Sequence, residues 1–222
     1  MLANKSIVKQ KFEPLEGSDQ VKRIKERMDQ ERYNTLPVVN QVTQKLIGQI
    51  NRDQIEDMSD EAPVSDLELD EAVKIYQGQH IFEAARLMLQ HELHLLPVVD
   101  KEWTYIGVLT KEKVLESLSR MLNLASFGSV ITVELSKINF SISEIVQIIE
   151  TEGANILGVT VETPAEADKK FEVSFKLNLK DVSRVVAALR RYEYTVLAES
   201  KSTVFGEDLE NRADELLNYI DM

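Results

Sequence analysis

The chain contains no cysteine, which excludes disulfide bonds, thiolate metal ligands and a cysteine nucleophile. It also lacks any run of about 18 consecutive apolar residues, the length that a membrane-spanning helix requires. The residues after Met1 lead into the polar segment 9–11 without the apolar core of a signal peptide. Together these absences predict a cytoplasmic protein without a membrane partner.

Positive charge is scarce, because 26 Lys and Arg face 38 Asp and Glu and leave a net charge of −12. Nucleic acids and anionic membranes attract clusters of Lys and Arg, so we expect neither as a partner. A small anionic ligand in a local pocket remains compatible with this charge. The 222 residues, 43% hydrophobic and 29% charged, predict a globular protein with one or two domains.

An internal duplication occupies the first half of the chain. Leu-Pro-Val-Val at 36–39 is followed by Ile-Gly at 47–48, and sixty residues later the same four residues at 96–99 are followed by Ile-Gly at 106–107. Each Pro-Val-Val run predicts a short strand with proline at its first position, where no ladder hydrogen bond is lost. The repeated order predicts two similar units that pack together.

Helices are expected on both sides of each strand pair. Apolar residues spaced i, i+3, i+7 form one helical stripe before each pair: Val21, Ile24 and Met28 in the first copy, and Ile81, Ala84 and Met88 in the second. A final helix is expected over 52–58 in the first copy and over 111–121 in the second. Gly48 and Gly107 leave room for close approach of a backbone or a ligand.

The pattern changes beyond Ser129. Strands are expected at 130–135, 156–162, 171–177 and 195–198, and helices begin near Ser141 and Val182. Ser141 and Glu144 predict a capping box, and Gly153 a C-cap. The order βαββαβ is ferredoxin-like, so the fold class is α+β. Further on, Leu209, Ala213, Leu216, Leu217 and Ile220 predict an amphipathic C-terminal helix.

The duplicated order of helix, Pro-Val-Val strand and Ile-Gly strand resembles the CBS domain family, whose tandem pair forms a Bateman module. That resemblance implies adenosine nucleotides bound between the repeats. In the family, a hydroxyl residue three positions after the glycine contacts phosphate, and an Asp three positions later contacts the ribose. Asn51 and Gln54 stand at these positions in the first copy, and Thr110 and Lys113 in the second.

The resemblance therefore gives a set of candidate ligand residues, and two interpretations of them stay open. Thr110 with Lys113 suits a ligand rich in phosphate, because lysine is a point charge for anions. Alternatively, the sites are vestigial and the repeats serve as a scaffold. The candidate residues are Thr35, Leu36, Asn51, Gln54, His94, Leu96, Thr110 and Lys113.

The segment Glu152–Ile156, before the second strand of the C-terminal half, resembles the ACT domain family, which commonly binds amino acids where two domains pair. The family's ligand loop corresponds to Lys137–Ser141, which has no glycine. The candidate residues there are Asn139, Phe140 and Ser141. Alternatively, Phe140 fills the site as a hydrophobic staple. The whole architecture is similar to that of acetoin-utilisation-type CBS–ACT proteins.

No glycine-rich phosphate loop, nucleophile elbow or catalytic carboxylate pair stands out, so we expect no enzyme and no catalytic residue. His91 and His94 alone make a poor zinc site, and we expect no metal. We predict a regulatory sensor that binds a small-molecule effector, an adenosine nucleotide being the candidate and no other cofactor being expected. It would signal through a homodimer or higher homo-oligomer to an unidentified target protein. The alternative is a structural or interaction scaffold.

The predicted organisation has five parts. They are a first CBS repeat at 1–58, an acidic linker at 59–70, a second CBS repeat at 71–122, an ACT-like domain at 127–200 and an amphipathic helix at 205–222.

Overall fold

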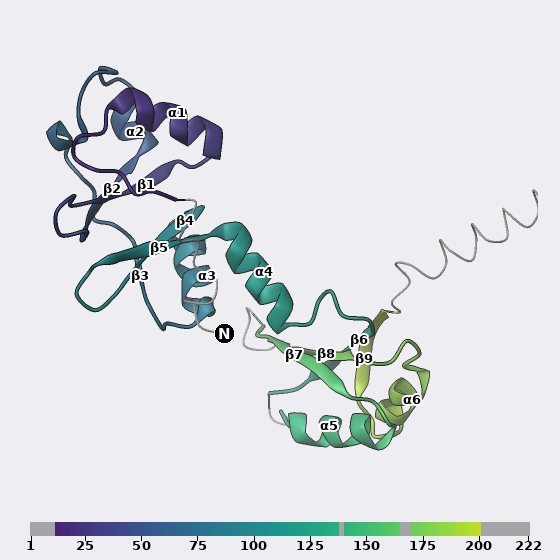
Figure 1. Cartoon of the computed structure of the whole chain (residues 1–222). Helices are drawn as coiled ribbons and strands as arrows, with labels where there is room; N and C mark the ends of the chain where they lie inside the picture. The colour runs from purple at the N-terminus through teal and green to yellow at the C-terminus, as the bar shows by residue number, and fades with distance from the viewer. Residues whose placement is uncertain (1–11, 138–139, 165–169, 201–222) are drawn as a thin grey trace, which may run out of the picture. The chain divides into compact units, whose positions relative to one another are not determined.

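The computed structural model describes residues 12–137, 140–164 and 170–200. It divides into two compact units after Leu118, with mixed α and β structure in each, which confirms the α+β class (Figure 1). The expected helix at 205–222 and Asn139 lie outside the described residues. Within the described part, no helix is long and apolar enough to cross a membrane.

The first unit consists of two repeats, here called the first and second repeat. The first contains α1 (Val21–Glu31), β1 (Thr35–Val39), β2 (Leu46–Asn51) and α2 (Arg52–Ile55). A 3₁₀ turn (Val64–Asp66) and β3 (Ile75–Tyr76) lead to the second, which contains α3 (Ile81–Gln90), β4 (Leu95–Val99), β5 (Tyr105–Thr110) and α4 (Lys111–Met121).

The strand pairing confirms the duplication. In the first hairpin Val38 pairs with Gly48, and in the second Val98 pairs with Gly107. Both hairpins are antiparallel, and each shifts register once, directly after these pairs. The predicted helical stripes are buried in both copies, Ile24 and Ala84 completely.

Two details of the expected elements are wrong. Pro37 is the third residue of β1 rather than the first, yet its carbonyl accepts a hydrogen bond from the Leu15 N–H (2.8 Å). Because the nitrogen and carbonyl of one strand residue point to the same side, the Pro37 nitrogen faces away from β2 and no ladder bond is lost. Helix α2 ends at Ile55, since the Met58 N–H bonds the Ile55 carbonyl in a tighter i→i+3 turn.

The two repeats are joined through their hairpin loops. The Leu46 N–H donates to the Trp103 carbonyl (3.0 Å), and the Tyr105 N–H donates to the Gln44 carbonyl (2.9 Å). Gln44 and Trp103 both have positive φ, which aims each carbonyl at the other repeat. Side chains of the second repeat, Leu95 among them, also belong to the core cluster of the first. The expectation that the repeats pack together is confirmed.

The acidic segment 59–70 packs on the start of α1. Gln20, the N-cap of this helix, makes no side-chain cap bond, and the carbonyls of Asp60 and Ala62 accept the first helical N–H groups instead (3.0 and 2.9 Å). These bonds satisfy donors that a helix start otherwise leaves unpaired. Val64 is buried in the same core.

The second unit has a four-stranded antiparallel sheet in the order β7-β8-β6-β9. This is the order of a ferredoxin-like fold, so the predicted βαββαβ arrangement is confirmed. One face of β6 and β8, including Ile131 and Phe175, packs on both helices to form the core. The elements are β6 (Ser129–Leu135), α5 (Ile142–Thr151), β7 (Ile156–Glu162), β8 (Phe171–Leu177), α6 (Ser183–Arg191) and β9 (Thr195–Ser200).

The predicted capping box at the start of α5 is wrong. Ser141 makes no side-chain cap bond, and its hydroxyl lies 3.1 Å from the Ser143 hydroxyl. The Glu144 carboxylate instead accepts a hydrogen bond from the Tyr194 hydroxyl (2.6 Å), a charge-assisted bond stronger than a neutral one. Phe140 packs against Phe171, with ring centroids 4.9 Å apart.

Gly153 follows α5 with φ of +81°, which confirms it as the glycine that ends this helix.

Candidate functional site

Three candidate residues of the first repeat come together at the end of its hairpin. The register pairs Thr35 with Asn51, and the Thr35 hydroxyl donates to the Asn51 side-chain oxygen (2.7 Å). The Gln54 side chain accepts from the Asn51 N–H (2.7 Å) and donates to the Glu68 carbonyl (3.1 Å). Thr35, Asn51 and Gln54 are therefore linked to one another by hydrogen bonds.

Asp70 completes this network and was missed by the sequence analysis. Its carboxylate accepts a hydrogen bond from the Asn51 side-chain amide (2.6 Å), and its backbone exchanges two bonds with Gln49 (3.0 and 3.1 Å). A Cβ on Gly48 would lie 2.7 Å from the Leu69 Cβ and 2.9 Å from the Asp70 carbonyl oxygen. Because Gly48 has no Cβ, the backbone of residues 69–70 can pack against it. No pattern in the neighbouring sequence predicts this long-range contact.

In the second repeat the candidate groups lie at the start of α4. The Thr110 hydroxyl accepts the Lys113 N–H (3.3 Å), and the His94 carbonyl accepts the Lys111 N–H (2.8 Å). The Lys113 ammonium pairs with Glu116 at 2.7 Å, with both side chains about half exposed. A hydroxyl, an ammonium and the His94 backbone therefore share one helix start.

The start of α4 also faces the first repeat. Burial raises the pKa of the Tyr33 phenol, and the negative charges of Glu112 and Glu31 raise it further. Tyr33 follows α1, whereas Glu112 lies in the first turn of α4, so the two repeats meet here. We call the group Tyr33, His94, Thr110 and Lys113 the junction site.

Leu36 and Leu96 are placed differently from the other candidates. Both side chains are completely buried in the core, because they point inward from β1 and β4. Only the backbone of these two residues is left to meet a ligand.

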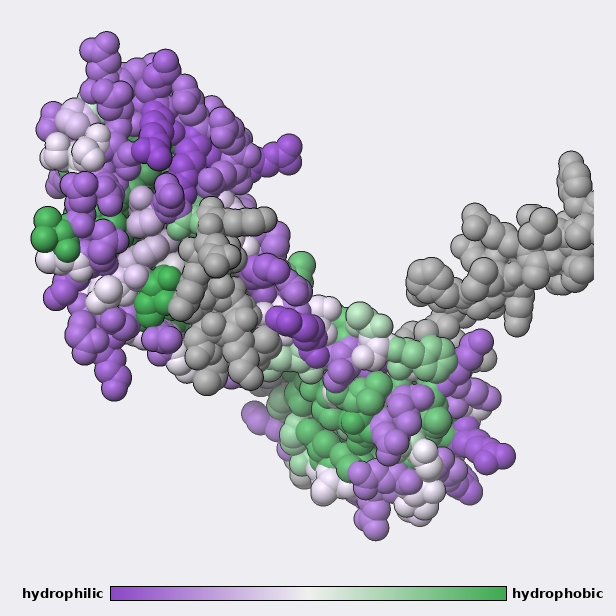
Figure 2. Space-filling model, in the orientation of Figure 1, coloured by the Kyte–Doolittle hydropathy of each residue, from purple (hydrophilic) through white to green (hydrophobic). Residues whose placement is uncertain are grey.

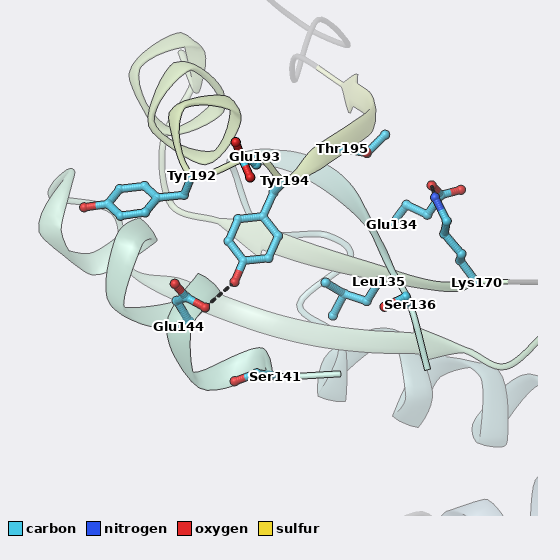
Figure 3. Close-up of a pocket in the computed structure, with 10 residues that line it drawn as sticks. All are labelled: Glu134, Leu135, Ser136, Ser141, Glu144, Lys170, Tyr192, Glu193, Tyr194 and Thr195. Atoms are coloured by element: carbon cyan, nitrogen blue, oxygen red, sulfur yellow. Dashed lines mark hydrogen bonds and ion pairs between the residues drawn. The ribbon is translucent and has the colours of Figure 1, made fainter. Parts of the chain in front are cut away.

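A second candidate site lies at one end of the sheet in the second unit (Figure 3). This sheet-end pocket has a volume of about 520 Å³ and is lined in part by Ser141, whereas Phe140 is not one of its lining residues. Its lining comes from the end of β6, the start of α5 and β8, and the segment between α6 and β9: Glu134, Leu135, Ser136, Ser141, Glu144, Lys170, Tyr192, Glu193, Tyr194 and Thr195.

Negative charge prevails in the sheet-end pocket. Lys170 is paired with Glu134 at 2.5 Å, which leaves Glu144 and Glu193 without a compensating cation among the lining residues. Figure 3 shows the Tyr194 hydroxyl directed at Glu144. Burial, this hydrogen bond and the charge of Glu144 raise the pKa of Tyr194 to about 12, so it stays neutral. The pocket therefore suits a cationic group better than an anionic one.

No three His, Asp or Glu side chains within the described ranges are arranged to hold a metal ion. His91 ends α3 through its backbone N–H, which bonds the Leu87 carbonyl, and His94 contributes its carbonyl to the junction site.

Residues 64–120 match the family model of the CBS domain. No curated protein matches the chain.

Three similar solved structures illustrate the likeness. CBS domains of a transcriptional regulator from Streptococcus pneumoniae are 21% identical, covering 52% of this chain and 98% of that one, with a TM-score of 0.47. A CBS domain pair/ACT domain protein from Thermotoga maritima is 26% identical, covering 54% and 98%, with a TM-score of 0.48. CBSX2 in complex with AMP is 20% identical, covering 54% and 96%, with a TM-score of 0.45.

The family match covers the whole second repeat from α3 to the last turn of α4. The first repeat has the same hairpin with the same register shift. The chain is therefore similar to the CBS domain family over residues 64–120, and its first repeat has the same hairpin as this matched segment.

Proposed function

We propose that this chain is a non-enzymatic regulatory protein that binds an adenosine nucleotide at the junction site and acts as a homodimer. The observation that carries the proposal is the convergence of Thr110 and Lys113 on the first turn of α4. A hydroxyl, an ammonium and the positive end of an eleven-residue helix together favour phosphate. The Lys113–Glu116 pair is solvent-exposed, so exchanging it for a phosphate contact costs little.

The junction site favours ATP over AMP. Lys113 stands where the family's ribose-binding Asp is expected, so recognition of the ribose is weakened while attraction to phosphate is gained. Each further phosphate adds charge within reach of the lysine. The preference follows from this one exchange of an acid for a base.

The first repeat is the place where the scaffold alternative applies. Thr35, Asn51, Gln54 and Asp70 already satisfy one another's hydrogen bonds, and a nucleotide would have to break them. Breaking bonds between partly buried polar groups is unfavourable unless the ligand replaces each of them. We therefore propose one nucleotide per chain, bound by the second repeat, with the first repeat as its structural partner.

Isothermal titration of the full chain with ATP and with AMP tests the proposal. We expect one ATP per chain, weaker binding of AMP, and at least a tenfold loss of ATP affinity in Lys113→Ala. Tenfold corresponds to about 1.4 kcal/mol, the lower end of what a charged hydrogen bond contributes. Lys22→Ala, an exposed lysine of α1, is the control and should bind normally.

Two results would contradict this function. Absence of heat at millimolar ATP would leave the scaffold as the better description. Equal loss of affinity in Lys113→Ala and Lys22→Ala would mean that ATP is attracted by surface charge in general and that the junction site is not its place.

A second candidate function concerns the sheet-end pocket. Its volume is within the usual range for small-ligand sites, and the unit around it has the sheet order expected of an ACT-like domain. An amino acid would place its ammonium beside Glu144 and Glu193 and its carboxylate near the first N–H groups of α5. This arrangement makes an amino acid, or a related amine, the ligand class to test.

A thermal melt with pools of amino acids is the measurement. A binding pool should raise the melting temperature of the full chain, because a ligand that binds only the folded state stabilises it. Glu144→Gln should abolish the shift, since it removes the charge that meets the ammonium. Glu150→Gln, an exposed acid of the same helix, should retain it. A shift that survives Glu144→Gln would exclude this pocket as the site.

A further inference from the structure

A second cavity adjoins the sheet-end pocket in the second unit. It lies between α5 and α6 and has a volume of about 300 Å³. Glu144 and Tyr192 line both cavities, and Figure 3 shows these two side chains where α5 and the end of α6 border the sheet-end pocket. We call the second cavity the helix groove. A ligand seated in the sheet-end pocket can therefore extend into the helix groove.

The helix groove follows one face of α5. Its lining residues there are spaced i, i+3, i+4, i+7 and i+8, which places them on a single side of the helix: Glu144, Gln147, Ile148, Thr151 and Glu152. Glu144 belongs to the first turn of α5, and Glu152 directly follows its last residue. The groove therefore extends along the helix with a carboxylate at each end.

The floor of the helix groove between these carboxylates is apolar. Ile148 and Ala188 are only 7% and 1% exposed and belong to the core of the second unit. The side chain of Tyr192, which is 59% exposed, lines the same groove. An apolar path that ends in a carboxylate on either side matches a methylene chain with an ammonium group at each end.

The charges of the two cavities call for two ammonium groups. Their combined lining contains four carboxylates and two cations: Glu134, Glu144, Glu152, Glu193, Lys170 and Arg191. Lys170 is paired with Glu134, and Arg191 is paired with Glu152 at 3.2 Å. Two negative charges are thus left without a cation among the lining residues, which is the charge that two ammonium groups neutralise.

Arg191 competes for the Glu152 end of the helix groove. Its side chain is 71% exposed, whereas that of Glu152 is only 25% exposed. Because an exposed ion pair contributes little to stability, a ligand ammonium can replace the guanidinium at small cost. Glu152 keeps a cationic partner in either case.

The length of the helix groove selects the length of the ligand. Glu144 and Glu152 are eight residues apart, which is about 12 Å along a helix. Five carbons between two nitrogens span roughly 7 Å when extended, and a contact of about 2.8 Å at each end brings the reach to about 13 Å. A two-carbon diamine reaches only about 9 Å by the same reckoning and is too short.

We propose that the sheet-end pocket and the helix groove together bind an unbranched amine with an ammonium group at each end, one held by Glu144 and the other by Glu152. The proposal rests on the second candidate function and names the ligand class of that site. A basic amino acid such as lysine and a diamine such as cadaverine share this chemistry.

Isothermal titration of the full chain with lysine, norleucine and cadaverine is the test. Norleucine is lysine without its terminal ammonium, and cadaverine is lysine without its carboxylate. Lysine should bind at least tenfold more tightly than norleucine, and cadaverine at least tenfold more tightly than ethylenediamine. The tighter of lysine and cadaverine identifies the source as an amino acid or as a diamine.

Two variants should move the preference for lysine over norleucine in opposite directions. Glu152→Gln should remove this preference and leave the affinity for norleucine unchanged, because only the terminal ammonium meets Glu152. Arg191→Gln should increase the preference, because it removes the competing cation. Glu150→Gln, an exposed acid on another side of α5, is the matched control and should bind all the ligands like the wild type.

A further control concerns apolar surface outside the helix groove. Figure 2 shows an apolar region over β7 and α5 of the second unit, where Val159 and Val161 are 40% and 43% exposed. Val159→Lys, Val161→Lys should leave all the affinities unchanged. Weaker lysine binding in this variant would place the ligand on that surface and overturn the proposal.

Equal affinities of lysine and norleucine in the wild type would also overturn the proposal, as would a preference that survives Glu152→Gln. Either result leaves the sheet-end pocket standing as an amino-acid site, provided that Glu144→Gln still weakens norleucine binding. Absence of heat from lysine, norleucine and cadaverine at millimolar concentration would refute that second candidate function together with the proposal.

Discussion

Phe175→Ala is expected to unfold the second unit of this protein well below the temperature at which the wild type unfolds. Phe175 is completely buried at the centre of the sheet, paired with Ile131 on β6 and Val159 on β7. Truncating a buried phenylalanine removes its transfer free energy and leaves a cavity, together about 3–5 kcal/mol. For a unit of this size, each kcal/mol lowers the melting temperature by roughly 4–8 °C.

Differential scanning calorimetry of the full chain measures this effect. Phe127→Ala is the matched control, because Phe127 is an exposed phenylalanine of the same unit and its removal should change little. We expect the substitution at Phe175 to lower one transition and to leave ATP binding at the junction site intact below that transition. A loss of stability no larger than that of the control would mean that neighbouring side chains rearrange to fill the cavity that the ring leaves.

Periodicity was sufficient to predict the strands of the second unit. Alternation at Phe171–Leu177 placed its odd-numbered residues on one face, and Val173, Phe175 and Leu177 are indeed buried there. The duplicated Pro-Val-Val and Ile-Gly runs predicted both hairpins by their repetition, since β1 and β4 are buried nearly throughout rather than at alternate residues. In the second unit the signal is local, because alternate residues of a half-buried strand face the core.

The wrong capping box and the missed Asp70 share the opposite cause, a partner distant in sequence. Ser141 and Glu144 have the spacing of a capping box, yet Tyr194 lies fifty positions away and takes the carboxylate. Asp70 looked like one more acid in a linker, but its backbone pairs with Gln49 and its carboxylate reaches Asn51. No property of the neighbouring residues encodes either contact, so only the folded chain reveals them.

Gly48→Ala is the second prediction with a large expected effect. The new methyl group would stand 2.7 Å from the Leu69 Cβ and 2.9 Å from the Asp70 carbonyl oxygen, so backbone must move rather than a flexible side-chain end. Overpacking of this kind destabilises proteins by about 1–3 kcal/mol. The displaced segment carries Asp70, so the bond from Asn51 should be lost as well.

Urea denaturation compares this variant with Gly17→Ala, whose methyl group would meet only the Ser65 Cβ at an ordinary 3.8 Å. The control should lie within about 1 kcal/mol of the wild type, since replacing a glycine in an unstrained conformation can even stabilise. Equal stabilities of the two variants would show that residues 69–70 yield easily and that Gly48 is not required for their approach.

ATP binding by Gly48→Ala also tests whether the first repeat takes part in nucleotide binding. If the hydrogen-bonded network around Asn51 is structural, Gly48→Ala should lower stability while the folded protein still binds one ATP with unchanged affinity. If the network instead holds a nucleotide, displacing Asp70 should weaken ATP binding as much as Lys113→Ala does. Titration of ATP into Gly48→Ala at low temperature, where the variant is folded, distinguishes these results. Thr35, Asn51, Gln54 and Asp70 already satisfy one another's hydrogen bonds. We therefore expect the first result, lower stability with unchanged ATP affinity.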